Sequence, residues 1–241
     1  MRMRTDRSFD RRRFLCGCCA GAAVTWVPTL TCATEQQVVP AHLEPHHHVR
    51  FESEYLRVLE VILDPGEATL FHEHTLDLAV VFVHRGWVRN EPLGAAQAAE
   101  GRPAAGAVLF NGYRGRRFVH RVTNLDTARM VQVDFEILLP EPGRFAVADR
   151  GAAYAPVLDN DRLRAWRLAV QPGQAAPSVA QTGPGLRVVL GGDRLTESVE
   201  GAPERQAHLR PGGFEWQPPG TVRALRNTGT SPVELAEFEL R

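Results

Sequence analysis

Residues 55–68 read Y-L-R-V-L-E-V-I-L-D-P-G-E-A, and residues 162–175 read R-L-R-A-W-R-L-A-V-Q-P-G-Q-A. Five positions are identical at a constant offset of 107: Leu56, Arg57, Pro65, Gly66 and Ala68 match Leu163, Arg164, Pro172, Gly173 and Ala175. A second pair of segments, H-R-V-T-N at 120–124 and R-A-L-R-N at 223–227, aligns at an offset of 103. This repetition at both ends of each half predicts two copies of one structural unit.

Each copy is predicted to consist of β-strands. Short runs rich in apolar and β-branched residues, such as L-R-V-L-E-V-I-L at 56–63 and L-A-V-V-F-V at 78–83, are separated by P-G, R-G and N-G turn signals. No long stretch has the helical periodicity of an amphipathic helix. The sequence therefore predicts an all-β protein made of sandwiches or barrels.

Composition excludes several classes of site. All four cysteines lie at or before Cys32, so the remainder can hold neither a disulfide framework nor a thiolate metal site. The chain as a whole has no net charge, but six of its arginines precede Phe14, which leaves the remainder mildly acidic. A mildly acidic chain lacks the clustered cations that bind phosphates, so no nucleic-acid partner is expected.

The segment 1–33 is predicted to be a signal peptide. Arg11 and Arg12 precede Phe14-Leu15, and the apolar run from Phe14 to Val27 is too short to span a bilayer. The R-R-x-F-L pattern resembles a twin-arginine signal, and an ordinary secretory signal is the alternative. With cleavage after Ala33, the mature protein is expected to be periplasmic or secreted and free of the membrane.

Two histidine motifs occur in the first half. Gly66 is followed, after five intervening positions, by H-E-H at 72–74, and Gly106 precedes H-R-V-T-N at 120–124. These motifs resemble the two cupin motifs, G-x5-H-x-H-x(3,4)-E-x6-G and G-x5-P-x-G-x2-H-x3-N. The resemblance to the cupin superfamily implies two tandem cupin (jelly-roll) β-barrels, a bicupin.

The expected organisation follows from the repeat and from the breaks in the strand pattern. A lead-in segment at 34–50 is followed by barrel one at 51–140, a linker at 141–157 and barrel two at 158–241. Two fused barrels already resemble a cupin dimer, so the protein is expected to be a monomer or a homodimer.

His72, His74 and His120 are the predicted metal ligands. Side chains at i and i+2 of a strand point the same way, so His72 and His74 would face the barrel interior together. Three imidazoles fit one divalent metal ion; Fe or Mn is favoured, and Cu, Ni or Zn stays open. The resemblance implies dioxygenase-like activity on a small organic molecule. Alternatives are a decarboxylase or isomerase of a small acid or sugar, a non-catalytic binding or metal-storage cupin, and a cupin without metal.

The first half departs from the cupin motifs in its carboxylate. The spacing for the usual glutamate ligand falls on Leu78 or Ala79, neither of which can coordinate a metal. Asp77 is the nearest carboxylate and is a candidate catalytic residue or ligand, or else a rim residue. Three arginines shortly before His120 are candidate substrate-binding residues, with a plain exposed loop as the alternative: Arg114, Arg116 and Arg117.

The second half is predicted to be degenerate, with no metal site. His72 aligns with Val179, His74 with Gln181 and His120 with Arg223. Arg223 would either bind an anion or plug the second barrel by pairing with Glu215 or another acid. The H-H-H run at 46–48 is expected to be a solvated polar segment, or to cover one barrel mouth.

Overall fold

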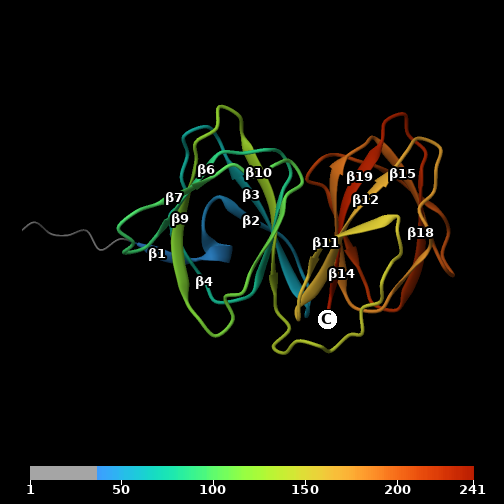
Figure 1. Ribbon diagram of the computed structural model, residues 1–241, viewed down its shortest axis with the longest axis horizontal. Helices are drawn as coiled ribbons and strands as arrows, with labels where there is room; N and C mark the ends of the chain where they lie inside the picture. Colours follow the sequence, from blue (N-terminus) through green and yellow to red (C-terminus); the bar gives the residue numbers. More distant parts are fainter. Residues whose placement is uncertain (1–36) are drawn as a thin grey trace, which may run out of the picture. The chain divides into compact units, whose positions relative to one another are not determined.

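β-Strands make up nearly all of the regular structure in residues 37–241, the part of the chain that the computed structural model describes (Figure 1). These residues contain one short 3-10 helix, η1 (Ala41–Leu43). The predicted signal segment at 1–33 lies outside the described residues, so export stays a prediction. In the described part, no helix is long and apolar enough to cross a membrane.

Two five-stranded sheets form the first barrel. Sheet A contains, in spatial order, β1 (Val38–Pro40), β4 (Phe71–His74), β9 (Phe118–Asn124), β6 (Val88–Pro92) and β7 (Ala99–Gly101). Sheet B contains β2 (His47–Glu52), β3 (Leu56–Leu63), β10 (Met130–Ile137), β5 (Leu78–Phe82) and β8 (Val108–Asn111).

Two further sheets form the second barrel. Sheet C contains β11 (Tyr154–Asp159), β12 (Leu163–Val170), β19 (Val233–Leu240), β14 (Gly185–Gly191) and β17 (Phe214–Gln217). Sheet D contains β13 (Val179–Gln181), β18 (Thr221–Asn227), β15 (Arg194–Val199) and β16 (Arg205–His208). The prediction of an all-β protein with two tandem jelly-roll barrels is confirmed.

Equivalent strands of the two barrels pair in the same register as well as in the same order. His72 of β4 pairs with His120 of β9, and the aligned Val179 of β13 pairs with Arg223 of β18. The motif asparagine is structural in both barrels, because the side-chain amide of Asn124, like that of Asn227, donates to two backbone carbonyls across a turn. The alignment from sequence therefore assigns equivalent positions in the two cavities.

Sheet B packs against sheet C through a shared core. Alternation along each strand sends every second side chain out of its barrel, and these outward side chains are mostly apolar in both sheets. Phe135 and Phe238, for example, meet edge to face with ring centroids 5.0 Å apart. The shared core consists mainly of Leu56, Val58, Ala79, Val81, Val133, Phe135 and Ile137 from sheet B, and Leu163, Ala165, Leu186, Val188, Ala236, Phe238 and Leu240 from sheet C.

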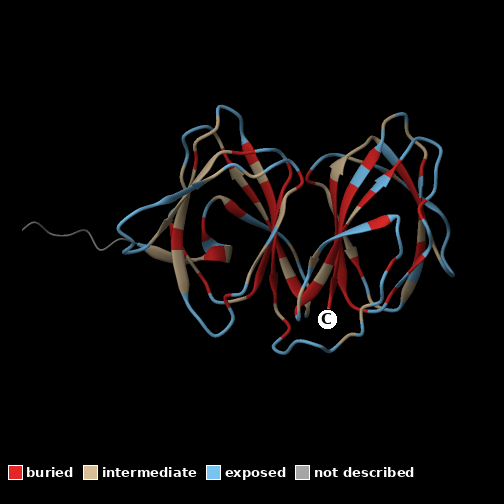
Figure 2. Ribbon diagram, viewed as in Figure 1, coloured by how far each residue is buried: buried red, intermediate tan, exposed pale blue. Residues whose placement is uncertain are grey.

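The distribution of buried residues matches the packing of sheet B on sheet C. Figure 2 shows buried residues along β3 and β10 in one barrel and along β12, β14 and β19 in the other. The described residues 37–241 accordingly form one compact unit, not two. Each barrel covers an apolar sheet face that its neighbour would otherwise expose.

The segment expected as a loose lead-in contributes strands to the first barrel. β1 pairs in parallel with β4, where Val39 lies opposite His72, and β2 pairs with β3. β11 likewise begins at Tyr154, inside the stretch expected as a linker. All three strands lie at the edges of their sheets.

Two leucine-to-alanine substitutions, one inside the shared core and one outside it, should differ strongly in their effect on the free energy of unfolding. Leu163→Ala removes a fully buried side chain from the shared core and should lower the free energy of unfolding by about 2–5 kcal/mol. Leu93→Ala is the matched control, because Leu93 is 40% exposed, and should change it by less than about 0.5 kcal/mol. Urea unfolding followed by tryptophan fluorescence measures both; equal effects would contradict packing between the sheets.

Candidate metal centre

The structure brings the three predicted ligands together inside the first barrel. His72 and His74 lie two positions apart on β4, so both point to the interior, and His120 reaches the same point from the neighbouring strand β9. All three are buried, with exposed fractions of 1%, 2% and 8%. One nitrogen from each imidazole lies within 4.8 Å of the others, and the ring centroids are 4.5 to 5.1 Å apart.

Hydrogen bonds on the far side of two rings select the nitrogens that face the centre. His72 Nδ1 donates to the carbonyl oxygen of Leu70 at 3.0 Å, and His120 Nδ1 donates to Asn90 Oδ1 at 2.8 Å. A proton on Nδ1 leaves the lone pair of Nε2 free in each ring. Such partners orient metal-binding imidazoles and make them better donors.

The three imidazoles are uncharged at neutral pH. Burial, followed by repulsion from neighbouring imidazoles, lowers the pKa of His72 to about 4, of His74 to about 2 and of His120 to about 3. Neutral imidazole is the form that binds a metal ion.

The donor set fits a divalent metal ion. Nε2 of His74 lies 3.1 Å from Nε2 of His120, so two acceptor atoms face each other unless a proton or a cation lies between them. Among residues 37–241, His74 Nδ1 has no hydrogen-bond partner. A metal bound by all three Nε2 atoms would remove the conflict and leave coordination positions for other ligands.

A leucine occupies the cavity-facing position for the missing carboxylate. Leu78 lines the cavity beside the histidines, whereas Ala79 points outward into the shared core. Asp77 does not line the cavity. Its carboxylate instead pairs with Arg162 of the second barrel at 2.8 Å and accepts a hydrogen bond from the backbone N–H of Arg114 at 2.9 Å. The geometry gives Asp77 a role in joining the barrels and offers no support for a catalytic one.

The three candidate substrate-binding arginines also lie outside the cavity lining. Arg114 donates to the carbonyl oxygen of Leu139 at 2.6 Å, and Arg116 donates to that of Gly112 at 2.8 Å. Arg117 forms an exposed ion pair with Glu73. Their contacts match the alternative of a surface loop.

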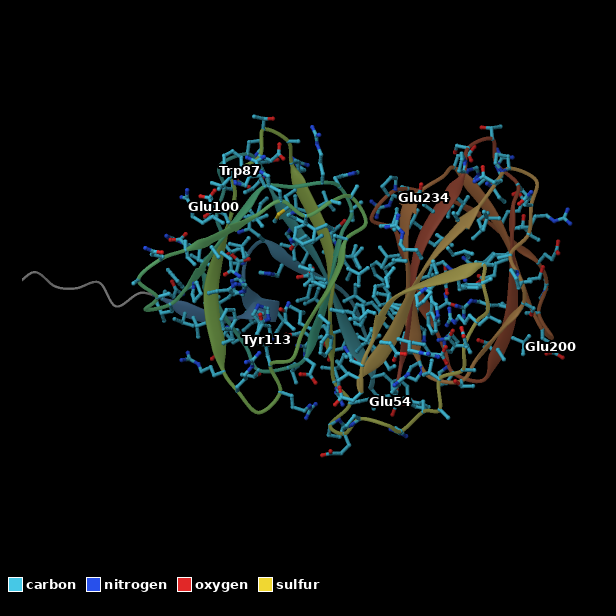
Figure 3. All side chains as sticks on the ribbon, viewed as in Figure 1. Glu54, Trp87, Glu100, Tyr113, Glu200 and Glu234 are labelled. Carbon is cyan, nitrogen blue, oxygen red and sulfur yellow. The ribbon has the colours of Figure 1, made fainter. Side chains whose placement is uncertain are left out.

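The cavity beside the three histidines has a volume of about 170 Å³. The surface of its wall is more apolar than polar, and polar side chains from several strands also face inward, as in small-molecule sites. Tyr113, labelled in Figure 3, stacks on His74 with ring centroids 5.2 Å apart, and burial raises its pKa to about 12. The lining residues beside the three histidines are His47, Val61, Thr69, Leu78, Val80, Phe82, Val88, Asn90, Leu109, Asn111, Tyr113, Val122, Gln132 and Asp134.

His47 is a cavity residue that sequence analysis assigned to a solvated segment. That prediction is wrong for His47, which is buried and lies 4.6 Å from the ring of His72, and correct for His48, which is exposed. Nδ1 of His47 hydrogen-bonds the buried carboxylate of Glu44 at 2.8 Å. Burial alone would raise the pKa of Glu44, but hydrogen bonds from His47, His46 and the Leu70 N–H lower it to about 2. The sequence offered no clear signal for this, because burial along β2 does not alternate and its pairing with β3 shifts in register between Val49 and Phe51.

Asp134 was also missed. Asp134 lies two positions after Gln132 on β10, so both side chains face the cavity, whereas Phe135 faces the shared core. The run V-Q-V-D-F-E-I at 131–137 carried this signal, because its polar residues recur every second position.

An ion-pair network fills the corresponding region of the second barrel. Glu237 is fully buried, and its carboxylate pairs with Arg187 at 2.7 Å, with Arg150 at 2.9 Å and with Arg223. Arg223 also donates to Gln181 Oε1 at 2.8 Å. Of the two predicted roles for Arg223, the structure shows the plug, with Glu237 as the acid; Glu215 pairs with Arg205 instead.

Comparison with known proteins identifies the fold. No protein-family model matches the sequence, and no curated protein matches it. Among solved structures, AerE from Microcystis aeruginosa is similar over 84% of this chain and 96% of its own, with 13% identity and a TM-score of 0.63. Lactobacillus farciminis oxalate decarboxylase is similar over 80% and 83%, with 12% identity and a TM-score of 0.57. A single-substitution mutant of salicylate 1,2-dioxygenase from Pseudoaminobacter salicylatoxidans is similar over 78% and 72%, with 14% identity and a TM-score of 0.54. The chain therefore has the cupin fold in its two-barrel form, with a buried three-histidine candidate metal site.

We expect the metal content of the protein to depend on the cavity histidines and not on an exposed histidine. His74→Ala removes one of three ligands and should abolish stoichiometric metal in protein purified without chelator or affinity tag. His48→Ala is the matched control and should leave metal content unchanged, because His48 is exposed on β2. Elemental analysis by mass spectrometry measures both; equal metal in His74→Ala and wild type would place the metal elsewhere.

The ion-pair network predicts a pH-dependent stability difference. Glu237→Gln leaves buried guanidinium groups uncompensated and should lower the free energy of unfolding by about 3–5 kcal/mol at neutral pH. The control Glu234→Gln removes a half-exposed ion pair with Arg167 and should cost at most about 1 kcal/mol.

The sign of the pH effect follows from Glu237 itself. Burial alone would raise its pKa, but Arg187, Arg223 and Arg150 lower it below the ordinary 4.5. The carboxylate therefore contributes stability above that pH, and this stability is lost as the pH falls toward the folded-state pKa. The difference between wild type and Glu237→Gln should shrink in acid; a difference that grows would refute the assignment.

Proposed function

We propose that this chain is an exported, metal-dependent cupin enzyme that acts on a small organic molecule in the cavity of the first barrel. Dioxygenase-like oxygenation is the favoured reaction. The observation that carries the proposal is the convergence of three buried, neutral imidazoles beside a cavity with a mostly apolar wall. A cavity beside the donors favours an enzyme over a metal store, since storage needs no room for a substrate.

His72, His74 and His120 would hold the metal through Nε2. A divalent ion bound there, Fe or Mn in this proposal, would supply Lewis acidity and open positions for substrate oxygens and O2. Leu70 and Asn90 keep the rings of His72 and His120 in the binding tautomer. The neutral ligand set leaves the positive charge of the ion available to polarise a substrate.

The cavity wall would orient the substrate and exclude water. Val80, Phe82 and Leu78 form an apolar surface on sheet B. Polar groups at fixed places, such as the Asn111 amide, can orient oxygen atoms of a ligand. The Glu44–His47 pair fixes His47 with Nδ1 engaged, so Nε2 is the atom at which it can hold or pass a proton.

A decarboxylase or isomerase is the second candidate. Two residues able to move protons, His47 and Asp134, line the cavity, and either reaction needs proton transfer without an oxidant. The same three histidines would then hold a metal acting as a Lewis acid only. The similar oxalate decarboxylase structure lends this candidate support at the level of the fold.

Export is proposed from the R-R-x-F-L pattern of residues 11–15 alone. Twin-arginine transport carries folded proteins, so the metal could be bound before export. Such an order suits weakly binding ions such as Mn or Fe, which lose to Cu or Zn in open competition.

Oxygen uptake tests the reaction. Protein purified with its own metal is mixed with small diketones, catechols and hydroxy acids while O2 and substrate are followed together. We expect equimolar loss of O2 and one substrate for wild type and His48→Ala, and none for His74→Ala. Substrate conversion without O2 uptake would favour the decarboxylase or isomerase, whereas bound metal with no conversion in a broad panel would favour a binding or storage protein.

A further inference from the structure

The carboxyl group of Asp134 is buried beside the candidate metal site without a partner. Asp134 lies on β10 between β3 and β5, where it pairs in register with Leu59 and Val80, and it is 4% exposed. It is the one carboxyl side chain among residues 37–241 that lines this cavity. Its Oδ1 is buried and makes no hydrogen bond within the described chain. Buried polar groups in folded proteins normally have partners, so this one is available to a ligand.

The second barrel supplies an internal comparison. Glu237 occupies the position equivalent to Asp134, because the offset of 103 relates the two residues and the offset of 107 relates their partners on the neighbouring strands, Leu59 to Trp166 and Val80 to Arg187. Three arginines surround Glu237, and they lower its pKa. Asp134 faces Val80 where Glu237 faces Arg187, so the same place in the fold lacks its cation in the first barrel.

The surroundings of Asp134 favour the uncharged carboxylic acid. Burial, with a smaller contribution from the nearby Glu136 carboxylate, raises the pKa of Asp134 well above its ordinary value. The other titratable side chains that line the cavity are Tyr113, His47 and the three ligand histidines. An uncharged carboxyl group is a hydrogen-bond donor, and an apolar enzyme cavity can keep a carboxyl protonated for that use.

Within residues 37–241, the cavity wall contains no lysine or arginine that could hold an anionic ligand. The whole chain has no lysine, so arginine is the only permanently cationic side chain available to it. Arg114, Arg116 and Arg117 are engaged in the loop outside the cavity. Arg89 and Arg121, next to lining residues on their strands, pair with Glu100 and Glu91. A carboxylate held away from the metal would therefore be desolvated without a cationic partner, which carries a large free-energy cost.

We propose that the cavity selects a small ligand that is uncharged apart from the oxygens bound to the metal, and that Asp134 donates a hydrogen bond to one of its hydroxyl or carbonyl oxygens. This inference rests on the proposed function, since it takes the cavity as the substrate site. It names the substrate class as diketones, hydroxyketones or phenols and excludes compounds with a free carboxylate. Asp134 is thus a specificity-determining residue.

Binding of three matched probes tests the proposal. Catechol, 3,4-dihydroxybenzamide and 3,4-dihydroxybenzoate share two adjacent hydroxyls, and the last two differ only by an amide in place of a carboxylate. Calorimetric titration under argon uses full-chain protein with its own metal, whose content is measured in the same samples. We expect the benzoate to bind roughly 10–100-fold more weakly than the benzamide, from the cost of an unpaired buried group. Equal or tighter binding of the benzoate would overturn the inference.

Two variants assign the effect to Asp134. Asp134→Asn keeps a donor and should bind catechol within about threefold of wild type, whereas Asp134→Leu removes it and should bind roughly tenfold more weakly. Asp134→Leu should fold at least as stably as wild type, because it replaces an unpaired polar group by an apolar one. Unchanged catechol binding by Asp134→Leu with full metal content would refute the role.

A measurement without ligand separates this inference from the proposed function. Infrared difference spectra of wild type and Asp134→Asn at neutral pH should show the carbonyl stretch of a protonated carboxylic acid in wild type only. Absence of that band would overturn the donor role even if the protein is a metal enzyme. If the band is present but wild type binds neither metal nor probe, the proposed function fails, and the substrate class fails with it.

Discussion

The two-sided sheet B is the constraint on which the rest of the structure depends. Strand alternation gives it an outer face that packs on sheet C and an inner face that lines the cavity. Because β10 lies at its centre, neighbouring residues serve different purposes: Phe135 stabilises the contact between barrels, while Asp134 faces the candidate metal centre. A change of one position in register would exchange the two faces and destroy both at once.

The two barrels show how one scaffold supports opposite electrostatics. In the first, an apolar wall and neutral imidazoles line a cavity; in the second, charged side chains at the same positions pair with one another. The equivalent pairs are Val80 and Arg187, Asn90 and Glu197, His120 and Arg223, and Asp134 and Glu237. The second barrel has exchanged a ligand site for a buried ion-pair network, which is stable only while each charge keeps its partner.

The degenerate barrel still supports the candidate site of the first one. It covers the outer face of sheet B, and Arg162 holds Asp77 in the loop after β4, the strand that carries two of the candidate metal ligands. Asp77 in turn accepts a hydrogen bond from the backbone of Arg114, next to Tyr113, which stacks on His74. A chain of contacts thus links the second barrel to a wall of the cavity.

The sequence by itself determined the repeat, the β-strands, the three histidines and the loss of ligands in the second barrel. These features depend on local rules, because side-chain direction in a strand alternates with a period of two and the motif spacings lie within single segments. The inward direction of Asp134 followed from the same alternation and was available in principle, whereas that of His47 was not, because a register shift interrupts β2. Only the tertiary structure decided which buried charges have partners. Asp77 meets Arg162 and Arg223 meets Glu237 through contacts between different strands and loops, whereas Asp134 meets no cation in the described chain, and proximity of that kind follows from how the sheets pack.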